Sequence, residues 1–152
     1  MANRMLVVPL AVIAVVLASG CAVGNTPTQA TEFVKEQVLS YANPIADSML
    51  PALNSGNYSQ FSASFSQTMA TALNLDKFNA LTSNLHASIG KYVSRDSAAE
   101  VVEIGGYYRV TYTTQFTMDS PVGFIITFSK DSGTHSVEGV FLTSKKLSGS
   151  LA

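Results

Sequence analysis

Hydrophobic and polar residues follow three successive patterns along this chain. Residues 5–17 form an uninterrupted apolar run. Apolar residues then recur at steps of three and four up to Ile89, which predicts amphipathic helices. After Lys91 apolar and polar residues alternate, a pattern typical of strands with one buried face. The chain is therefore expected to contain an apolar leader, then helices, then strands.

The first helical pattern is bounded by clear capping signals. Thr26 followed by Pro27 is a favourable N-cap and first-turn pair, and Gly56 is the natural left-handed residue after the helix. Pro44 and Pro51 interrupt the pattern, which predicts either a kinked helix or two consecutive helices. The apolar positions that share one helical face are Val34, Val38, Tyr41, Ile45, Met49 and Leu53.

Two further helices are expected before the strands. Asn57 followed by Gln60 resembles a capping box, and the helix that it opens would carry Tyr58, Phe61 and Phe65 inward. The next helix has the clearest pattern, and Gly90 stands where a terminator belongs. Its apolar positions are Phe78, Leu81, Leu85 and Ile89.

The strands begin with a hairpin signal. Residues 101–104 precede Gly105-Gly106, which predicts a tight turn into the next strand. That strand has an apolar and aromatic side and a side rich in hydroxyl groups, as expected for a sheet with one wet face. Its inward row is Tyr108, Val110, Tyr112, Thr114 and Phe116.

Two more strands complete the expected sheet. Asp119-Ser120-Pro121 is expected to turn the chain, and residues 130–133 to turn it again after the apolar row Phe124, Ile126 and Phe128. The last strand should run from about His135 to Thr143, with Val137 and Phe141 on one face. From Ser144 onward the tail is polar and expected to fray. The pattern predicts an α+β domain, with N-terminal helices packed on one curved antiparallel sheet.

Composition supports a single domain behind an export signal. Of the 152 residues 47% are hydrophobic and only 12% are charged, and the net charge is −1. Arg4, the apolar run and the small residues before Cys21 have the three-part layout of a secretory signal. We therefore expect a signal peptide over residues 1–20, a flexible tether over 21–30, the α+β domain over 31–147 and a polar tail over 148–152.

The only cysteine of the chain stands at the end of the signal. The segment Leu17-Ala18-Ser19-Gly20-Cys21 resembles the lipobox of prokaryotic lipoproteins. The resemblance implies cleavage before Cys21 and a lipid anchor on its thiol, on the outer face of a bacterial or archaeal cell membrane. The alternative is an uncleaved membrane anchor, but the apolar run is shorter than the roughly 20 residues that span a bilayer.

A second resemblance concerns the domain. The stretch Ala52-Leu53-Asn54-Ser55-Gly56-Asn57-Tyr58-Ser59-Gln60-Phe61, ending in Phe65-Ser66, is similar to the helical opening of nuclear transport factor-like (cystatin-like) domains. The later segment Ile89-Gly90-Lys91-Tyr92, followed by a meander with a Gly-Gly hairpin, is similar as well. The domain most resembles an uncharacterised family found on prokaryotic lipoproteins. The resemblance implies a curved sheet wrapped round a helix to form a cone-like cavity, whose function differs among members.

Candidate catalytic groups are few. Acid–base catalysis needs a tuned acid or base inside the cavity, yet the apolar rows of the central strands carry no carboxylate. Glu100, Glu103 and Glu138 alternate with hydrophobic neighbours and are expected to face water. His86 and His135 have no second ligand at metal-binding spacing, so no metal or cofactor is expected. The scattered lysines, with Lys145-Lys146 as the largest cluster, exclude a nucleic-acid partner.

The residues that could line a cavity are aromatic. The candidates are Tyr58, Phe61, Tyr108, Tyr112, Phe116 and Phe124. An ordinary filled core is the stronger interpretation of this set, although buried tyrosine hydroxyls need a partner that a ligand can supply. Asn57-Tyr58-Ser59 also matches the N-glycosylation pattern.

Three functions remain open at this point. A protein-interaction or dimerisation module, as a homodimer or with an envelope protein, is favoured slightly over a module that binds a small apolar ligand. An acid–base enzyme is the least supported, because the sequence offers no inward carboxylate.

We expect Cys21→Ser to release the protein from membranes or to leave it unprocessed, because the serine hydroxyl cannot take the lipid. Membrane fractionation with and without detergent, together with the intact mass, measures both effects. The lipid anchor would be contradicted if the Cys21→Ser variant still required detergent for extraction and differed from the wild type in mass only by the serine substitution.

Overall fold

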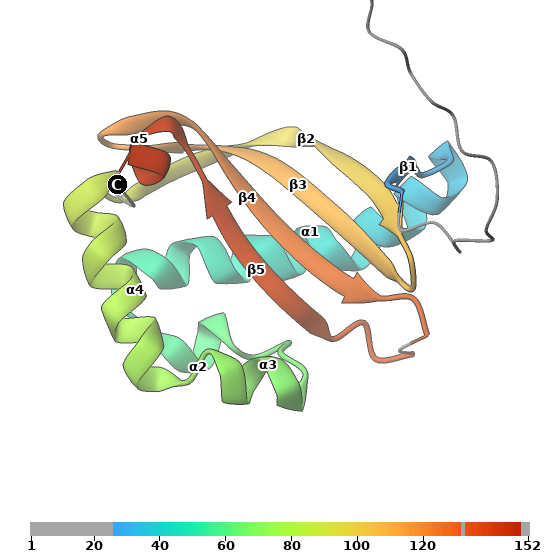
Figure 1. The fold of residues 1–152 in the computed structure, drawn as a ribbon, viewed down its shortest axis with the longest axis horizontal. Coiled ribbons are helices and arrows are strands. Elements are labelled where there is room, and N and C mark those ends of the chain that lie inside the picture. The colour runs from blue at the N-terminus through green and yellow to red at the C-terminus, as the bar shows by residue number, and fades with distance from the viewer. Residues whose placement is uncertain (1–25, 132, 150–152) are drawn as a thin grey trace, which may run out of the picture.

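Helices precede a meander of antiparallel strands in the computed structural model, which describes residues 26–131 and 133–149 (Figure 1). The predicted signal peptide and Cys21 lie outside the described residues. In chain order the elements are β1 (Thr28–Gln29), α1 (Glu32–Ser55), α2 (Tyr58–Phe61), α3 (Gln67–Ala72), α4 (Leu75–Ser88), β2 (Tyr92–Ile104), β3 (Tyr107–Phe116), β4 (Asp119–Ser129), β5 (Val137–Thr143) and α5 (Lys145–Gly149).

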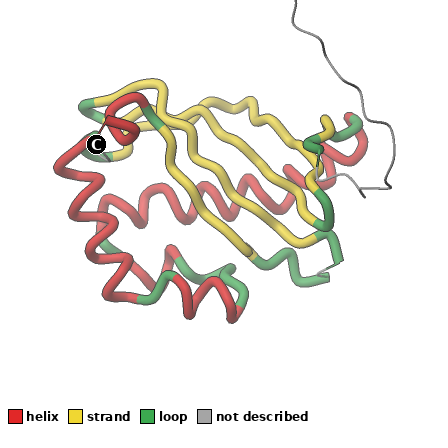
Figure 2. Tube along the Cα trace, in the orientation of Figure 1, coloured by secondary structure: helices red, strands yellow, loops and turns green. Residues whose placement is uncertain are grey.

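The strands form one curved antiparallel sheet in the order β1-β2-β3-β4-β5. Figure 2 shows the strands as one layer, with α1 passing behind it and the other long helix, α4, beside the sheet. This arrangement confirms the predicted α+β class. From β2 to β5 each strand pairs with the next one along the chain, because short connections join them, whereas β1 and β2 pair although four helices lie between them in sequence.

The first helix begins later than its sequence suggests. Thr31, and not Thr26, is the N-cap: its side-chain oxygen accepts a hydrogen bond from the backbone N–H of Val34 at 3.4 Å. Thr28–Gln29 instead pairs with β2, and the N–H of Ala30 donates to Val101 O. The predicted start at Thr26-Pro27 is therefore wrong, because an available sheet edge takes these residues into β1.

Both prolines lie inside the single helix α1. Pro44 and Pro51 are seven residues apart and both are exposed, so the two rings lie on the solvent side. Each proline lacks an N–H, so one carbonyl oxygen of the preceding turn loses its helical donor. On the solvent side that oxygen can accept a hydrogen bond from water, which explains how one helix includes both prolines. Gly56 ends α1 with φ of 65°, as predicted.

The predicted second helix is much shorter than expected. Asn57 caps α2 as predicted, by accepting from the N–H of Gln60 at 3.1 Å, but α2 ends at Phe61. Phe65 lies outside the helix and forms an isolated bridge with Val137 of β5. The chain then forms α3, whose N-cap is Ser66 and which the sequence pattern did not predict.

Gly90 ends α4 as predicted, and the same residue fixes the following strands. Its φ is +83°, and a Cβ here would collide with Thr117. The missing side chain leaves room for Met118 N to donate to Ile89 O and for Thr117 N to donate to Lys91 O. These bonds place the turn at residues 117–118, so the turn expected at Asp119-Ser120-Pro121 is wrong and these residues open β4. Pro121 fits there because the ladder between β3 and β4 is irregular at this point.

The predicted inward rows of β3 and β4 are confirmed. Val110, Tyr112, Phe124, Ile126 and Phe128 are fully buried. The Gly105-Gly106 hairpin also forms, with Ile104 opposite Tyr107.

The last strand differs from the prediction in its start and in its faces. It begins at Val137 and not at His135. Val137 is fully buried whereas Phe141 is 67% exposed, so the two do not share a face. The register between β4 and β5 shifts between Thr127 and Phe128, and this bulge reverses the alternation that the sequence suggested.

The tail after Ser144 is helical over part of its length, contrary to the expected fraying. Ser144 Oγ accepts from Leu147 N at 3.1 Å at the start of α5, and Leu147 packs against the core. The contact of Leu147 with the core thus stabilises a segment whose polar composition predicted an unstructured end. Among the described helices, none combines the length and apolar character that crossing a bilayer requires.

Substitution of two glycines by alanine should separate strain from steric conflict. Both Gly56 and Gly90 have positive φ, which costs an alanine about 1 kcal/mol. A Cβ on Gly56 would meet nothing within 4 Å, whereas one on Gly90 would lie 2.0 Å from Thr117 Oγ1. We expect Gly56→Ala to lower the free energy of unfolding by about 1 kcal/mol and Gly90→Ala by about 3 kcal/mol. Urea denaturation measures both, and equal losses would contradict the close approach at Gly90.

Candidate functional site

The six aromatic candidates are mostly part of the core. Phe61, Tyr112, Phe116 and Phe124 are buried, and Tyr58 and Tyr108 are half-buried and pack against them. The hydroxyl of Tyr58 donates to Leu73 O at 2.9 Å and that of Tyr112 to Asn43 Oδ1 at 3.1 Å. These two hydroxyls therefore have intramolecular partners. Among the concavities described below, only one includes a member of this set, namely Tyr108.

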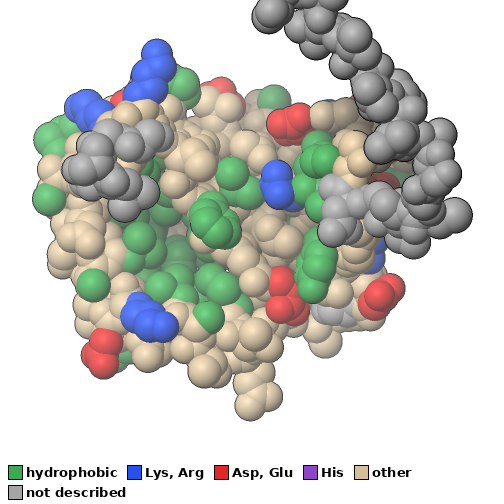
Figure 3. Space-filling view, in the orientation of Figure 1, with side chains coloured by type: hydrophobic (Ala, Val, Ile, Leu, Met, Phe, Trp, Pro, Cys, Tyr) green, Lys and Arg blue, Asp and Glu red, His purple; other side chains and the backbone are tan. Residues whose placement is uncertain are grey.

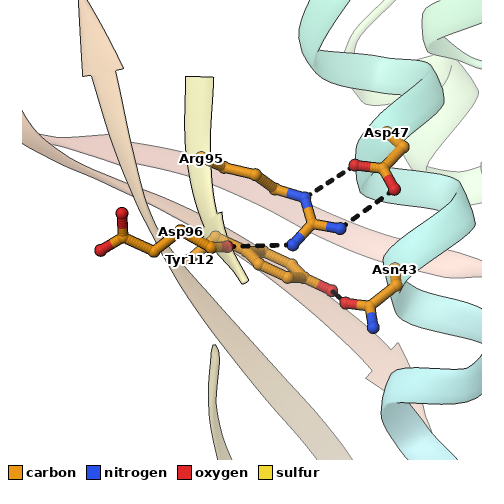
Figure 4. Close-up of polar contacts among 5 residues, drawn as sticks. All are labelled: Asn43, Asp47, Arg95, Asp96 and Tyr112. Atoms are coloured by element: carbon orange, nitrogen blue, oxygen red, sulfur yellow. Dashed lines mark hydrogen bonds and ion pairs between the residues drawn. The ribbon is translucent and has the colours of Figure 1, made fainter. Parts of the chain in front are cut away.

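A polar cluster links α1 to β2 and lies against the ring of Tyr112 on β3. We call Asn43, Asp47, Arg95 and Tyr112 the arginine cluster (Figure 4). Arg95 donates to the two carboxylate oxygens of Asp47 at 2.7 and 3.0 Å, and its guanidinium carbon lies 4.9 Å from the centre of the Tyr112 ring. No local sequence pattern indicates this cluster, because Asp47 and Arg95 are 48 positions apart.

The arginine cluster supports a bulge in β2. Between Arg95 and Ala99 the register with β3 shifts, and Arg95 also donates to Asp96 O at 3.1 Å. The hydrogen bonds to Asp47 raise the pKa of Arg95, and burial raises the pKa of Tyr112. Both groups thus keep their protons at neutral pH. An arginine that stays charged and a phenol that stays protonated suit a structural brace rather than proton transfer.

An apolar groove lies between α4 and the edge strand β5. In Figure 3 hydrophobic side chains gather in a hollow between these two elements. The cavity measures about 530 Å³. Phe141 lies at its rim, 67% exposed, and Asn84 and Ser88 are its polar lining residues. The side chains that define the apolar groove are Leu73, Leu81, Leu85, Val140, Leu142 and Leu147.

A second concavity has the opposite chemistry. It measures about 350 Å³ and lies between the first half of α1, the start of β3 and the end of β4. We call it the tyrosine pocket, because Tyr41 and Tyr108 line it together with Lys130 and His135. The Tyr41 and His135 rings are stacked, with centres 3.9 Å apart and planes at 6°.

The three glutamates singled out in the sequence have partners within the fold, whereas the buried Nε2 atom of His86 has none among the described residues. Glu100 accepts from Gln29, Glu103 pairs with Lys130, and Glu138 accepts from Ser66 Oγ at 2.8 Å. Asn57, the residue of the glycosylation pattern, is exposed and caps α2. His86 is half-buried on α4 and lines neither concavity. Within residues 26–131 and 133–149, no group of three potential ligands could hold a metal ion.

Comparison with known families places the chain in one of them. The profile of the family described as "Protein of unknown function (DUF3887)" matches residues 46–134, more than half of the chain. The chain therefore belongs to this family. The match includes Asp47, Arg95 and Tyr112, as well as the α4 wall of the apolar groove, and ends before β5. No curated protein and no solved structure matches the chain significantly.

We expect Arg95→Lys to lower the free energy of unfolding by about 1 kcal/mol, because lysine cannot form the paired hydrogen bonds or cover the Tyr112 ring as a flat group. Arg109→Lys, on the exposed outer face of β3, is the matched control and should change stability by less than about 0.5 kcal/mol. Chemical denaturation measures both variants. If Arg95→Lys and Arg109→Lys were equally stable, the arginine cluster would not brace the bulge.

Proposed function

We propose that this member of the DUF3887 family is a lipid-anchored extracytoplasmic lipoprotein whose domain is a protein-interaction module. The observation that carries the proposal is the apolar groove between α4 and β5. An apolar concavity of about 530 Å³ that opens at a sheet edge is suited to an apolar segment of an envelope partner.

The edge strand beside the groove adds a second means of binding. β5 is the last strand of the sheet. At Val137 its outer edge is covered by the segment before α3, because Val137 exchanges backbone hydrogen bonds with Ser64 and Ser66. Val140 and Leu142, further along β5, line the groove. A partner in extended conformation can pair with such an edge while its apolar side chains enter the groove.

The chemistry of the groove argues against catalysis there. Its lining contains no titratable side chain, and its polar members are the neutral groups of Asn84 and Ser88. General acid–base catalysis requires a group that gives or takes a proton within hydrogen-bond reach of the substrate. Binding is therefore the function that this site supports.

The proposed anchor and the groove are compatible in space. β1, which lies within the last residues of the segment 21–30 expected to be the tether, is at one end of the sheet in Figure 1, and α4 lies at the other. A partner can therefore reach the groove while the lipid on Cys21 holds the opposite end of the domain at the membrane. The helix-covered, curved sheet also agrees with the proposed likeness to nuclear transport factor-like domains.

A small apolar ligand is the second candidate for the same groove. Its volume falls within the range of small-molecule sites, which is roughly 300–1,000 Å³. The filled core that surrounds Tyr112 and Phe124 leaves the groove, and not the interior of the sheet, as the place for such a ligand.

Native mass spectrometry on the full chain, extracted gently in detergent from an exporting host, tests the proposal. We expect a protein mass bound to the wild type, and Phe141→Asp should lower its occupancy at least about tenfold, because a charge would enter an apolar contact. Val93→Asp is the control, since Val93 is an exposed strand residue that does not line the groove.

The masses separate the candidates. A bound small molecule that Phe141→Asp removes would favour the apolar ligand over a protein partner. A wild-type protein without any bound mass, or a partner that both aspartate variants retain equally, would contradict the groove as the binding site.

A further inference from the structure

The tyrosine pocket is chemically distinct from the apolar groove and lies elsewhere in the fold. Val34 and Val38 of α1 form one wall, and Ser129 and Lys130 at the end of β4 belong to another. The segment after β4 contributes His135, whose backbone is left-handed with φ of 50°. Such a conformation is uncommon for a residue other than glycine, and here it accompanies the stacking of the imidazole on Tyr41.

Two phenol hydroxyls in this pocket have no hydrogen-bond partner among the described residues. They belong to Tyr41 and Tyr108, which both line the pocket, and Tyr108 lies close enough to contribute to the raised pKa of Tyr41. Burial, and then the neighbouring Tyr108, raise the pKa of Tyr41 to about 12. Its hydroxyl therefore remains a hydrogen-bond donor at neutral pH.

Among the remaining polar residues of the pocket, Lys130 can only donate, whereas Gln37, Ser40, Ser129 and His135 can donate or accept. The Lys130 ammonium lies 5.0 Å from the centre of the Tyr108 ring and forms an ion pair with Glu103. No carboxylate is among the residues that line the pocket. Because Glu103 already balances part of the lysine charge, the pocket suits an anion with a single charge better than one with two.

We propose that the tyrosine pocket binds the carboxylate group of a small organic acid. The hydroxyls of Tyr41 and Tyr108 and the ammonium of Lys130 donate to the two carboxylate oxygens. The stacked Tyr41–His135 pair and the valines of α1 contact the apolar body of the acid. This site is independent of the apolar groove, so either one can fail without the other.

Calorimetric titration of the full chain in detergent with benzoate tests the site, with benzamide and inorganic phosphate as comparison ligands. Benzoate should bind at least about tenfold more tightly than neutral benzamide, because it accepts charge-assisted hydrogen bonds. The double variant Tyr41→Phe/Tyr108→Phe keeps both rings and should weaken benzoate binding by about tenfold or more.

Two further variants complete the design. Tyr107→Phe alters an exposed tyrosine next to Tyr108 in sequence and should leave benzoate binding unchanged. Lys130→Met should abolish binding, but it also leaves Glu103 without its ion-pair partner. The double tyrosine variant, with its fold checked by circular dichroism, therefore decides the outcome.

The proposal is overturned if benzoate does not bind at millimolar concentration or binds the double variant as well as the wild type. Benzamide binding as tightly as benzoate would show that the carboxylate is not recognised. Phosphate binding more tightly than benzoate would replace the organic acid by an inorganic anion and would equally overturn the assignment.

Discussion

The packing of α1 against the inner face of the sheet determines where anything else can bind. Three of the fully buried residues of α1 are alanines, Ala42, Ala46 and Ala52, whose small side chains allow close packing. Large side chains of the strands, including Tyr112 and Phe124, are fully buried in the same core. A close-packed interior has no room for a ligand, so a ligand or partner has to bind outside this helix–sheet contact.

The two concavities lie in two such places and differ in chemistry. The apolar groove lies where α4 and α5 meet the edge strand β5, and its lining consists mainly of leucine and valine. The tyrosine pocket lies where the first half of α1 meets the start of β3 and the end of β4, and it offers hydroxyl, ammonium and imidazole groups. One surface can gain free energy from burying apolar area, the other from hydrogen bonds to an acceptor.

Membership of the DUF3887 family concerns the middle of the fold. The matched residues 46–134 include the C-terminal part of α1 from Ala46 onward, the brace formed by Asp47 and Arg95, and strands β2 to β4. They exclude β5, whose bulge turns Phe141 outward and Val140 and Leu142 toward the groove. The groove is thus built partly from the family's common region and partly from the chain that follows it.

Local sequence signals determined the elements whose formation depends on local physics. The steps of three and four in Phe78, Leu81, Leu85 and Ile89, the positive φ required of Gly90, and the Gly105-Gly106 turn were sufficient to predict α4 and the β2–β3 hairpin. The alternation in β3 likewise predicted its buried row, because side chains of a strand point to opposite faces in turn.

Tertiary structure alone decided the rest, because the deciding contacts join residues far apart in sequence. Thr28–Gln29 became a strand by pairing with β2, and a register shift opposite β4 placed Val137 and Phe141 on opposite faces. Neither Leu147 in the groove nor the meeting of Tyr41 with His135 has a local pattern that would reveal it. The fold class follows from short-range periodicity, whereas both candidate binding surfaces are formed by long-range contacts.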